Sequence, residues 1–313
     1  MKIVWKLAAI GAAAAVIIYF IVFRPGGPAR LRNEEQGAPA GPGAIRVVAA
    51  EDFYGSVASQ LGGNLVAVKS IISSPNIDPH EYESSVKDGI AVARAAIVIK
   101  NGLQYDTWLD KMLSASPSPG RIVITAGDSA PRRLSGNPHV WYGVDNMEAV
   151  AKAVDNALIK VRPSEAPFFK SNLARFQASL APLLAKINEI RQKYHGTPVG
   201  LTETICLYLT GPMGLRVLTP FDFQKAIAEG NDPPAASVAV ANTQVDRKEI
   251  KILIYNRQTV TPVTTALLGQ ARARGIPLVP VSETMPPGGT YQSWMLAQMS
   301  AIGNGLSAAR GGR

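Results

Sequence analysis

Short runs rich in β-branched residues alternate with helix-like stretches through most of this 313-residue chain. Four runs in the first half are expected strands: residues 45–50, 67–73, 95–100 and 121–126. After Gly196 the alternation resumes, with expected strands at 198–201, 216–219, 250–255 and 278–281 and expected helices at 261–274 and 291–306. This alternation is typical of βαβ units and parallel sheets. With 47% hydrophobic residues, the chain can bury enough core for two α/β lobes.

Helical periodicity separates the two series of strands. Apolar positions recur at helical spacing from Met147 to Val161, and again from Ser164, an expected N-cap, to about Tyr194. Some 30 helical residues would span about 45 Å, more than the width of a small domain, and Pro182 should kink this helix. We therefore expect two parallel-sheet α/β lobes joined by a single long helix. The expected boundaries are 45–162 for the N-terminal lobe, 163–195 for the connecting helix and 196–309 for the C-terminal lobe.

The first 44 residues differ in composition from the rest. Lys2 and Lys6 lead into an apolar run that ends at Arg24, and a segment rich in Pro, Gly and Ala follows. With the residues just before it, the run approaches the roughly 20 residues needed to cross a bilayer core, and small residues of a cleavage site are not close behind it. Residues 1–24 are therefore expected to be a membrane anchor rather than a cleaved signal, and residues 25–44 a flexible linker.

Charge and cysteine content exclude several classes of protein. The formal net charge of +9 is scattered, and no run of Lys and Arg alternates with aromatic residues, so we expect no nucleic-acid partner. Cys206 is the only cysteine, which excludes an intramolecular disulfide. Because Ile205 and Leu207 flank it, we expect Cys206 to be a buried apolar residue rather than a ligand.

Two of the three histidines lie in similar Pro-His segments, each after an expected strand. These segments are Asp78-Pro79-His80-Glu81-Tyr82 and Asn137-Pro138-His139-Val140-Trp141. Glu203 follows the first strand of the second lobe, and Glu283 ends the last one. Because ligands collect beyond the carboxyl ends of parallel strands, two imidazoles would face two carboxylates across a cleft. Such donors suit Zn²⁺, Mn²⁺ or Fe²⁺.

Each candidate also has a purely structural interpretation. A loop histidine beside proline is commonly a hydrogen-bonded surface residue, and the ligand spacings form no local metal motif. Glu203 and Glu283 could instead be N-caps of the helices that follow them. His195, in Tyr194-His195-Gly196, is expected to be a helix C-cap residue.

Several short motifs together resemble a known family. The two Pro-His segments are accompanied by Asn101-Gly102-Leu103 with Trp108-Leu109, Glu229-Gly230-Asn231-Asp232-Pro233, Tyr255-Asn256-Arg257-Gln258-Thr259 and Glu283-Thr284-Met285-Pro286-Pro287 with Trp294-Met295. Over residues 45 to 307 the chain resembles the substrate-binding proteins of ABC transporters for zinc and manganese, the ZnuA/TroA-like family. This resemblance implies two lobes bridged by a long helix, with a metal ion held in the cleft.

The resemblance also implies a set of metal ligands. His80 and His139 match the first two, and Glu203 occupies the third position, which is His in zinc-type members and Glu in manganese-type members. The fourth is an acid near the start of the last helix, where this chain has Gly289. Glu283 is the expected substitute. Further candidates are Asp222 and Asp232.

Two departures from the family pattern bear on the metal and on the membrane. The segment before Asn137 is short and lacks the acidic, histidine-rich loop of many zinc-type members, which lowers the weight of zinc. A longer apolar segment replaces the lipid-bearing cysteine or short signal.

The expected function is that of an extracytoplasmic receptor that captures Zn²⁺ or Mn²⁺ as its ligand and passes it to a cognate ABC permease. We expect a monomer at the periplasmic or extracytoplasmic face of the membrane, anchored or exported by the N-terminal segment, with no catalytic or cofactor-binding residues. Metal binding should weaken below about pH 6, because histidine must lose its proton to ligate. One alternative is a metal-dependent hydrolase, although the chain has no HExxH helix. Another is an anchored adhesion module with a structural metal.

Overall fold

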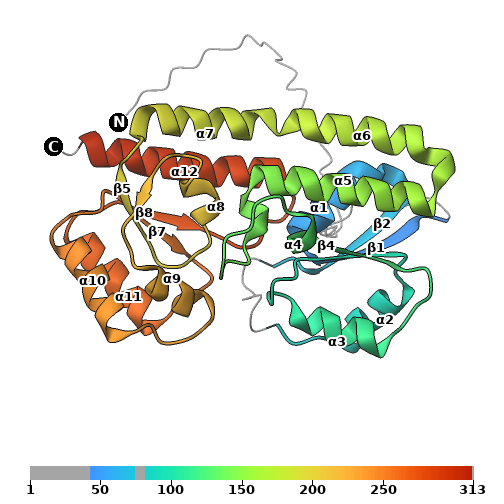
Figure 1. Cartoon of the computed structure of the whole chain (residues 1–313), viewed down its shortest axis with the longest axis horizontal. Coiled ribbons are helices and arrows are strands. Elements are labelled where there is room, and N and C mark those ends of the chain that lie inside the picture. Colours follow the sequence, from blue (N-terminus) through green and yellow to red (C-terminus); the bar gives the residue numbers. More distant parts are fainter. Residues whose placement is uncertain (1–42, 75–81, 312–313) are drawn as a thin grey trace, which may run out of the picture. The chain divides into compact units, whose positions relative to one another are not determined.

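The computed structural model describes residues 43–74 and 82–311, which all belong to one compact unit (Figure 1). The expected anchor at residues 1–24 and the segment that carries His80 lie outside the described residues. Two four-stranded parallel sheets, one in each half of the chain, confirm the predicted α/β fold class.

The first lobe, residues 45–161, has a sheet with the strand order β2-β1-β3-β4. Its strands are β1 (Ile45–Glu51), β2 (Val66–Ile72), β3 (Ile97–Lys100) and β4 (Ile122–Thr125). Side chains alternate between the two faces of the sheet. Val47 and Ala49 pack into one apolar core, and Val48 and Ala50 pack into another. Burial on both faces explains why these strands appear in the sequence as continuous β-branched runs.

Helices cover both faces of this first sheet. They are α1 (Asp52–Gly62), α2 (Val86–Arg94), α3 (Thr107–Ala115), α4 (Ala126–Ser129) and α5 (Val144–Val161), with short 3₁₀ turns η1 (Gly63–Leu65) and η3 (Val140–Tyr142). Residues of α1 and α5 share a core with Val47, whereas residues of α2 and α3 share one with Val48. A capping box at Ser85 and Asp88 starts α2.

The second lobe, residues 198–311, repeats the same arrangement with the strand order β6-β5-β7-β8. Its strands are β5 (Pro198–Leu201), β6 (Arg216–Val217), β7 (Leu253–Asn256) and β8 (Leu278–Val281), and its helices are α8 (Leu207–Thr210), α9 (Phe221–Ala228), α10 (Ala235–Asp246), α11 (Pro262–Ala273) and α12 (Tyr291–Gly311). In each sheet the order reverses beside the first strand, between β1 and β3 and between β5 and β7. Ligand sites form at such switch points, beyond the carboxyl ends of the strands.

The segment that connects the lobes differs from the prediction in two details. A 3₁₀ turn, η4 (Pro163–Glu165), precedes α6 (Ala166–Ser179), and the N-cap residue is Glu165, so the prediction of Ser164 as N-cap was wrong. The expected single helix is two helices, α6 and α7 (Ala181–Tyr194), which run end to end in Figure 1. The helix is interrupted at Leu180, and Pro182 lies in the first turn of α7, where its missing N–H costs no hydrogen bond.

Packing along this segment ties the lobes together. Helix α5 lies against α6, and α12 lies against α7 (Figure 1).

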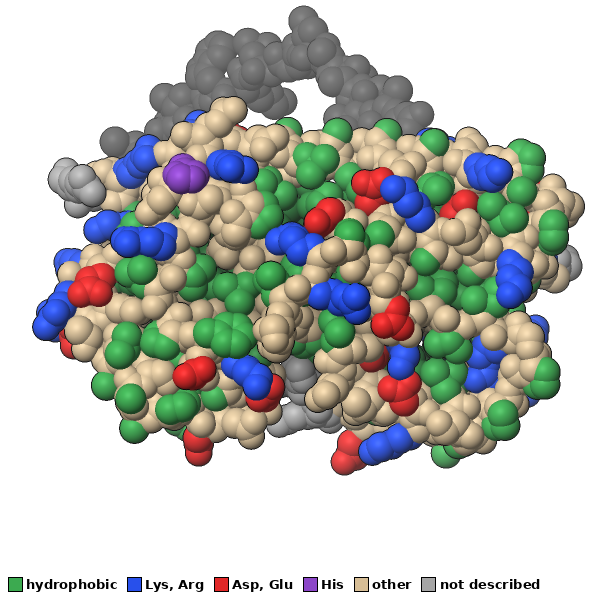
Figure 2. Space-filling model, viewed as in Figure 1, with side chains coloured by type: hydrophobic (Ala, Val, Ile, Leu, Met, Phe, Trp, Pro, Cys, Tyr) green, Lys and Arg blue, Asp and Glu red, His purple; other side chains and the backbone are tan. Residues whose placement is uncertain are grey.

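Figure 2 shows Lys and Arg side chains interspersed with Asp and Glu over the face in view, with no large patch of one charge. Within residues 43–74 and 82–311, no helix combines the length and the apolar character needed to cross a membrane.

Candidate metal centre

Three of the four predicted ligands come together between the lobes. One ligand atom each from His139, Glu203 and Glu283 lies within 4.8 Å of the others, and all three side chains are buried. The fourth, His80, lies outside the described residues and stays a prediction. The further candidates Asp222 and Asp232 are exposed and do not belong to this group.

His139 follows β4 and lies at the N-terminal end of η3, where its ring is held in one orientation. Its Nδ1 lies 2.8 Å from Asn137 Oδ1, and its backbone N–H donates to the same oxygen. Asn137 Nδ2 donates to the Thr204 carbonyl at 2.8 Å, which fixes Oδ1 toward the ring. Because an amide oxygen only accepts, Nδ1 carries the proton. The unprotonated Nε2 then faces Glu283 Oε2, at 4.0 Å, and is the nitrogen suited to a metal ion.

Glu203 lies two residues beyond β5 and is 1% exposed. The N-cap residue of the next helix, α8, is Cys206, so the N-cap interpretation of Glu203 was wrong. The loop that carries Glu203 is anchored on both sides. Thr202 Oγ1 accepts a hydrogen bond from the Asn256 backbone N–H, and the Thr204 carbonyl accepts the bond from Asn137 already described.

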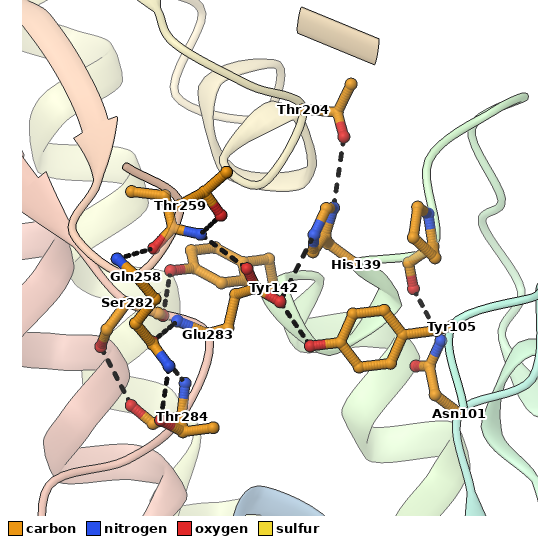
Figure 3. Close-up of polar contacts among 12 residues, drawn as sticks. Asn101, Tyr105, His139, Tyr142, Thr204, Gln258, Thr259, Ser282, Glu283 and Thr284 are labelled. Carbon is orange, nitrogen blue, oxygen red and sulfur yellow. Dashed lines mark hydrogen bonds and ion pairs between the residues drawn. The ribbon is translucent and has the colours of Figure 1, made fainter. Parts of the chain in front are cut away.

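Glu283 lies two residues beyond β8 and is fully buried. It is not an N-cap, because the following helix, α12, begins at Tyr291. Tyr105 Oη donates to Glu283 Oε2 at 2.5 Å, and Asn256 Nδ2 donates to Oε1 at 2.6 Å. In Figure 3 the Tyr105 hydroxyl and the His139 ring both point toward this carboxylate. The backbone N–H of Glu283 donates to Gln258 Oε1 at 2.7 Å, which also fixes the main chain.

Sequence reasoning missed three residues that hold these ligands: Tyr105, Asn137 and Asn256. All three lie in or beside segments that carried the family resemblance, and Asn256 ends β7, at the edge of the sheet where ligands collect. Their individual roles depend on contacts between distant residues, as with the 178 positions that separate Tyr105 from Glu283.

Acidic and aromatic side chains surround the group. Burial, and then the nearby Glu283 carboxylate, raises the pKa of Tyr105 well above its usual value, so the hydroxyl remains a donor at neutral pH. Burial raises the pKa of Asp106 to about 6, although the Gly102 and Asn101 N–H groups donate to its carboxylate. The indole of Trp141 lies beside the His139 ring, with centroids 5.1 Å apart. The three ligand side chains thus lie among buried acidic and aromatic residues.

The donor atoms suit a divalent transition ion. One imidazole nitrogen and two carboxylate oxygens fit Zn²⁺, Mn²⁺ or Fe²⁺, whereas a copper(I) or structural Cys₄ site would need thiolates. The structure also confirms the predictions that Cys206 is a buried apolar residue and that His195 is a helix C-cap. Cys206 is fully buried and free, and His195 is the exposed C-cap residue of α7.

Comparison with known proteins identifies the family. Residues 47–305 match the family described as zinc-uptake complex component A, periplasmic. The chain belongs to this family. The chain spans about half the length of the first curated relatives it matches.

Individual members of the zinc-uptake component A family are distant in sequence. The iron-binding protein YfeA of Yersinia pestis is 23% identical over 46% of this chain and 48% of its own length. The manganese ABC transporter substrate-binding lipoprotein PsaA of Streptococcus pneumoniae is also 23% identical, over 70% of each chain. Zinc-binding protein TroA of Treponema pallidum is 28% identical over 46% of this chain and 52% of its own length.

Solved structures share the fold. The periplasmic zinc-binding protein TroA from Treponema pallidum aligns with a TM-score of 0.71 at 20% identity, over 84% of this chain and 99% of that chain. The substrate-binding protein FpvC of Pseudomonas aeruginosa, in complex with Mn²⁺, aligns with a TM-score of 0.70 at 19% identity, over 84% and 98%.

Proposed function

We propose that this protein is the extracytoplasmic receptor of an ABC transporter that imports Zn²⁺ or Mn²⁺. The observation that carries the proposal is the buried convergence of His139, Glu203 and Glu283, one from the first lobe and two from the second. Membership of the zinc-uptake component A family supports it, as do relatives named for binding zinc, manganese and iron. His80, from the sequence, would complete the ligand set.

Capture without chemistry fits the burial of the ligands. A catalytic metal keeps one coordination position open to substrate or water. Here the three ligand side chains are at most 1% exposed, so a bound ion would be enclosed by protein. This favours a receptor over the metal-dependent hydrolase.

The partner and location follow from the same proposal. A receptor of this family delivers its ion to a membrane permease, so we infer a cognate ABC permease as partner and the periplasmic or extracytoplasmic face as location. Relatives named as lipoproteins support attachment to the membrane. Here the apolar segment at residues 1–24 would supply it.

The first test is metal binding by the purified full-length chain and three variants, His139→Ala, Glu203→Ala and Glu283→Ala. Loss of a residue that only supports a metal ligand typically weakens metal binding by about tenfold to a hundredfold. Removal of a ligand itself should weaken Zn²⁺ or Mn²⁺ binding by at least that much. Asp222→Ala, a change of an exposed carboxylate outside the group, should bind as the wild type does. Calorimetric titration measures the affinities, and circular dichroism checks that each variant folds.

Three results would contradict the proposal or part of it. Wild-type protein that binds neither ion would reject the receptor function. Wild-type affinity in Glu283→Ala would remove Glu283 from the ligand set. Hydrolysis of an ester or peptide that stops in His139→Ala would favour the hydrolase.

A further inference from the structure

Both oxygens of the Glu283 carboxylate accept hydrogen bonds, one from each lobe. Tyr105 Oη, from the first lobe, donates to Oε2 at 2.5 Å, and Asn256 Nδ2, from the second lobe, donates to Oε1 at 2.6 Å. All three side chains are at most 3% exposed. We call Tyr105 and Asn256 the Glu283 clamp.

The first donor of the clamp is fixed by its surroundings. The Tyr105 backbone N–H donates to the Gly102 carbonyl, closing a turn in which Gly102, Leu103 and Gln104 all have positive φ. Asp106 holds this turn through the backbone N–H groups of Asn101 and Gly102. The Tyr105 ring also lies against Trp141, with centroids 4.9 Å apart. The hydroxyl therefore cannot follow the carboxylate if the carboxylate rotates.

The second donor is fixed equally well. Asn256 ends β7, its backbone N–H donates to Thr202 Oγ1, and its Oδ1 accepts from the Gln258 backbone N–H at 3.0 Å. Because Oδ1 is held in this way, the amide presents its Nδ2 toward Glu283 and Thr259. Rotation of the amide would break these bonds together.

The clamp gives the two carboxylate oxygens different roles. Oε2 is the oxygen that lies 4.0 Å from His139 Nε2, and so it is the one directed at the group of ligands. Oε1 is turned to the Asn256 amide. Each carboxylate oxygen has two lone pairs, so a hydrogen bond by itself does not prevent an oxygen from binding an ion. For Oε1 to join Oε2 on one ion, however, the carboxylate would have to turn Oε1 toward His139 and away from Asn256 Nδ2.

The number of oxygens that Glu283 offers matters for the choice of ion. Zn²⁺ in proteins is commonly four-coordinate and accepts a mixture of nitrogen and oxygen ligands. Mn²⁺ favours more oxygen ligands in an octahedral arrangement. A carboxylate restricted to one oxygen therefore favours Zn²⁺, and one free to bind through two oxygens raises the relative affinity for Mn²⁺.

We propose that Tyr105 and Asn256 are positioning residues that restrict Glu283 to one-oxygen coordination and so bias the site toward Zn²⁺ over Mn²⁺. This inference rests on the proposed function, since it presumes that an ion binds at Glu283. The ligand types alone do not explain a preference for Zn²⁺, because Glu203 occupies the third ligand position as in manganese-type members. The Glu283 clamp would supply a separate basis for that preference.

The test compares Tyr105→Phe and Asn256→Ala with wild-type protein and with a matched control, Tyr142→Phe. Tyr142 is also fully buried, but its hydroxyl bonds the Ser282 carbonyl at 2.8 Å and Gln298 Oε1 at 2.9 Å, both in the second lobe, rather than the Glu283 carboxylate. Competition titrations of the full-length chain give the ratio of the Zn²⁺ and Mn²⁺ affinities. X-ray absorption of the Mn²⁺-loaded protein gives the number of atoms bound directly to Mn²⁺.

We expect the Zn²⁺ to Mn²⁺ affinity ratio to fall at least tenfold in Tyr105→Phe and in Asn256→Ala, with about one more oxygen around Mn²⁺. Tyr142→Phe should leave both quantities unchanged, although its melting temperature should fall as much as that of Tyr105→Phe. Tyr105→Phe removes only a hydroxyl, so it decides the matter even if Asn256→Ala fails to fold.

A ratio that stays within twofold of wild type in Tyr105→Phe would overturn the clamp, as would an equal change in Tyr142→Phe. Both of these outcomes leave the receptor function intact. If instead wild-type protein binds neither ion, the proposed function itself fails, and the two failures are thereby distinguished.

Discussion

At the scale of single residues, Glu51 is a buried acid that the proposed ligand set does not use. It ends β1, is fully buried, and neither carboxylate oxygen has a hydrogen-bond partner among the described residues. Burial raises the pKa of Glu51 well above its usual value, and the charges of Asp106, Asp52 and Glu283 raise it further. A buried, unpaired carboxylate is costly, so we expect Glu51 to hold a proton in the metal-free protein.

Glu51→Gln should flatten the decline of stability with pH in the metal-free protein. The pKa of Glu51 is higher in the folded protein than in the unfolded chain. The wild type therefore loses stability as pH rises from the pKa of the unfolded state, about 4.3, toward that of the folded state. The neutral amide has no such loss. Over that range the variant should gain up to about 1.4 kcal/mol relative to wild type for each pH unit. Urea unfolding with a chelator, from pH 4.5 to 8, measures this.

The exposed Glu249→Gln serves as the control for this experiment, and its stability should follow that of the wild type across the range. If the curves of Glu51→Gln and wild type run parallel instead, the carboxyl of Glu51 has the same protonation in the folded and unfolded states. Its burial would then require a charge partner that the described residues do not supply.

At the scale of elements, the interruption between α6 and α7 is held by packing. Leu180, at the interruption, is 2% exposed within the main core. Ser179 Oγ accepts from Gln292 Nε2 at 2.7 Å, and Gln292 also bonds Gln60, so α1 and α12 are both tied to this point. Pro182 lies in the first turn of α7, a position where proline is tolerated.

Pro182→Ala should therefore cost little, and Leu180→Ala much more. Loss of the proline frees the unfolded chain and should lower the free energy of unfolding by about 0.4–1 kcal/mol. Truncation of the buried leucine should lower it by about 2–5 kcal/mol. Chemical denaturation of both variants measures the difference. If Pro182→Ala is instead more stable than wild type by over about 1 kcal/mol, then the proline, and not the packing around Leu180, causes the interruption.

The elements that could be predicted from sequence are those whose signal is local. β1 and β3 bury both faces and so appear as continuous β-branched runs, and α11 begins with a capping box at Thr261. Pro182 is a local signal for a break in the connecting helix, but the position of the interruption at Leu180 depends on contacts with α1 and α12. The same limit applies at the site: Glu203 and Glu283 follow strands, whereas Tyr105 meets Glu283 only once the lobes are assembled.

At the scale of the whole molecule, one apolar core runs through both lobes. The Phe53 ring stacks on Trp141, with centroids 4.5 Å apart, and on Trp294, with centroids 5.9 Å apart. Trp141 and Phe53 belong to the first lobe and Trp294 to α12 of the second, and all three lie in the same core. Among the described residues, two smaller cores include residues of α2 and α3 in the first lobe and of α9, α10 and α11 in the second. The lobes should thus unfold together rather than separately.

This shared core predicts how metal affects stability. Chelation should leave the full-length protein folded, with one cooperative transition, because apolar burial and not the ion holds the lobes together. Added Zn²⁺ should then raise the free energy of unfolding by about 1.4 kcal/mol for each tenfold increase above the dissociation constant. In His139→Ala the rise should begin only at a Zn²⁺ concentration at least about tenfold higher. Calorimetry with chelator and with graded Zn²⁺ measures both. Unfolding by chelator alone would instead favour a structural metal, because only an ion required for the fold makes its removal equivalent to denaturation.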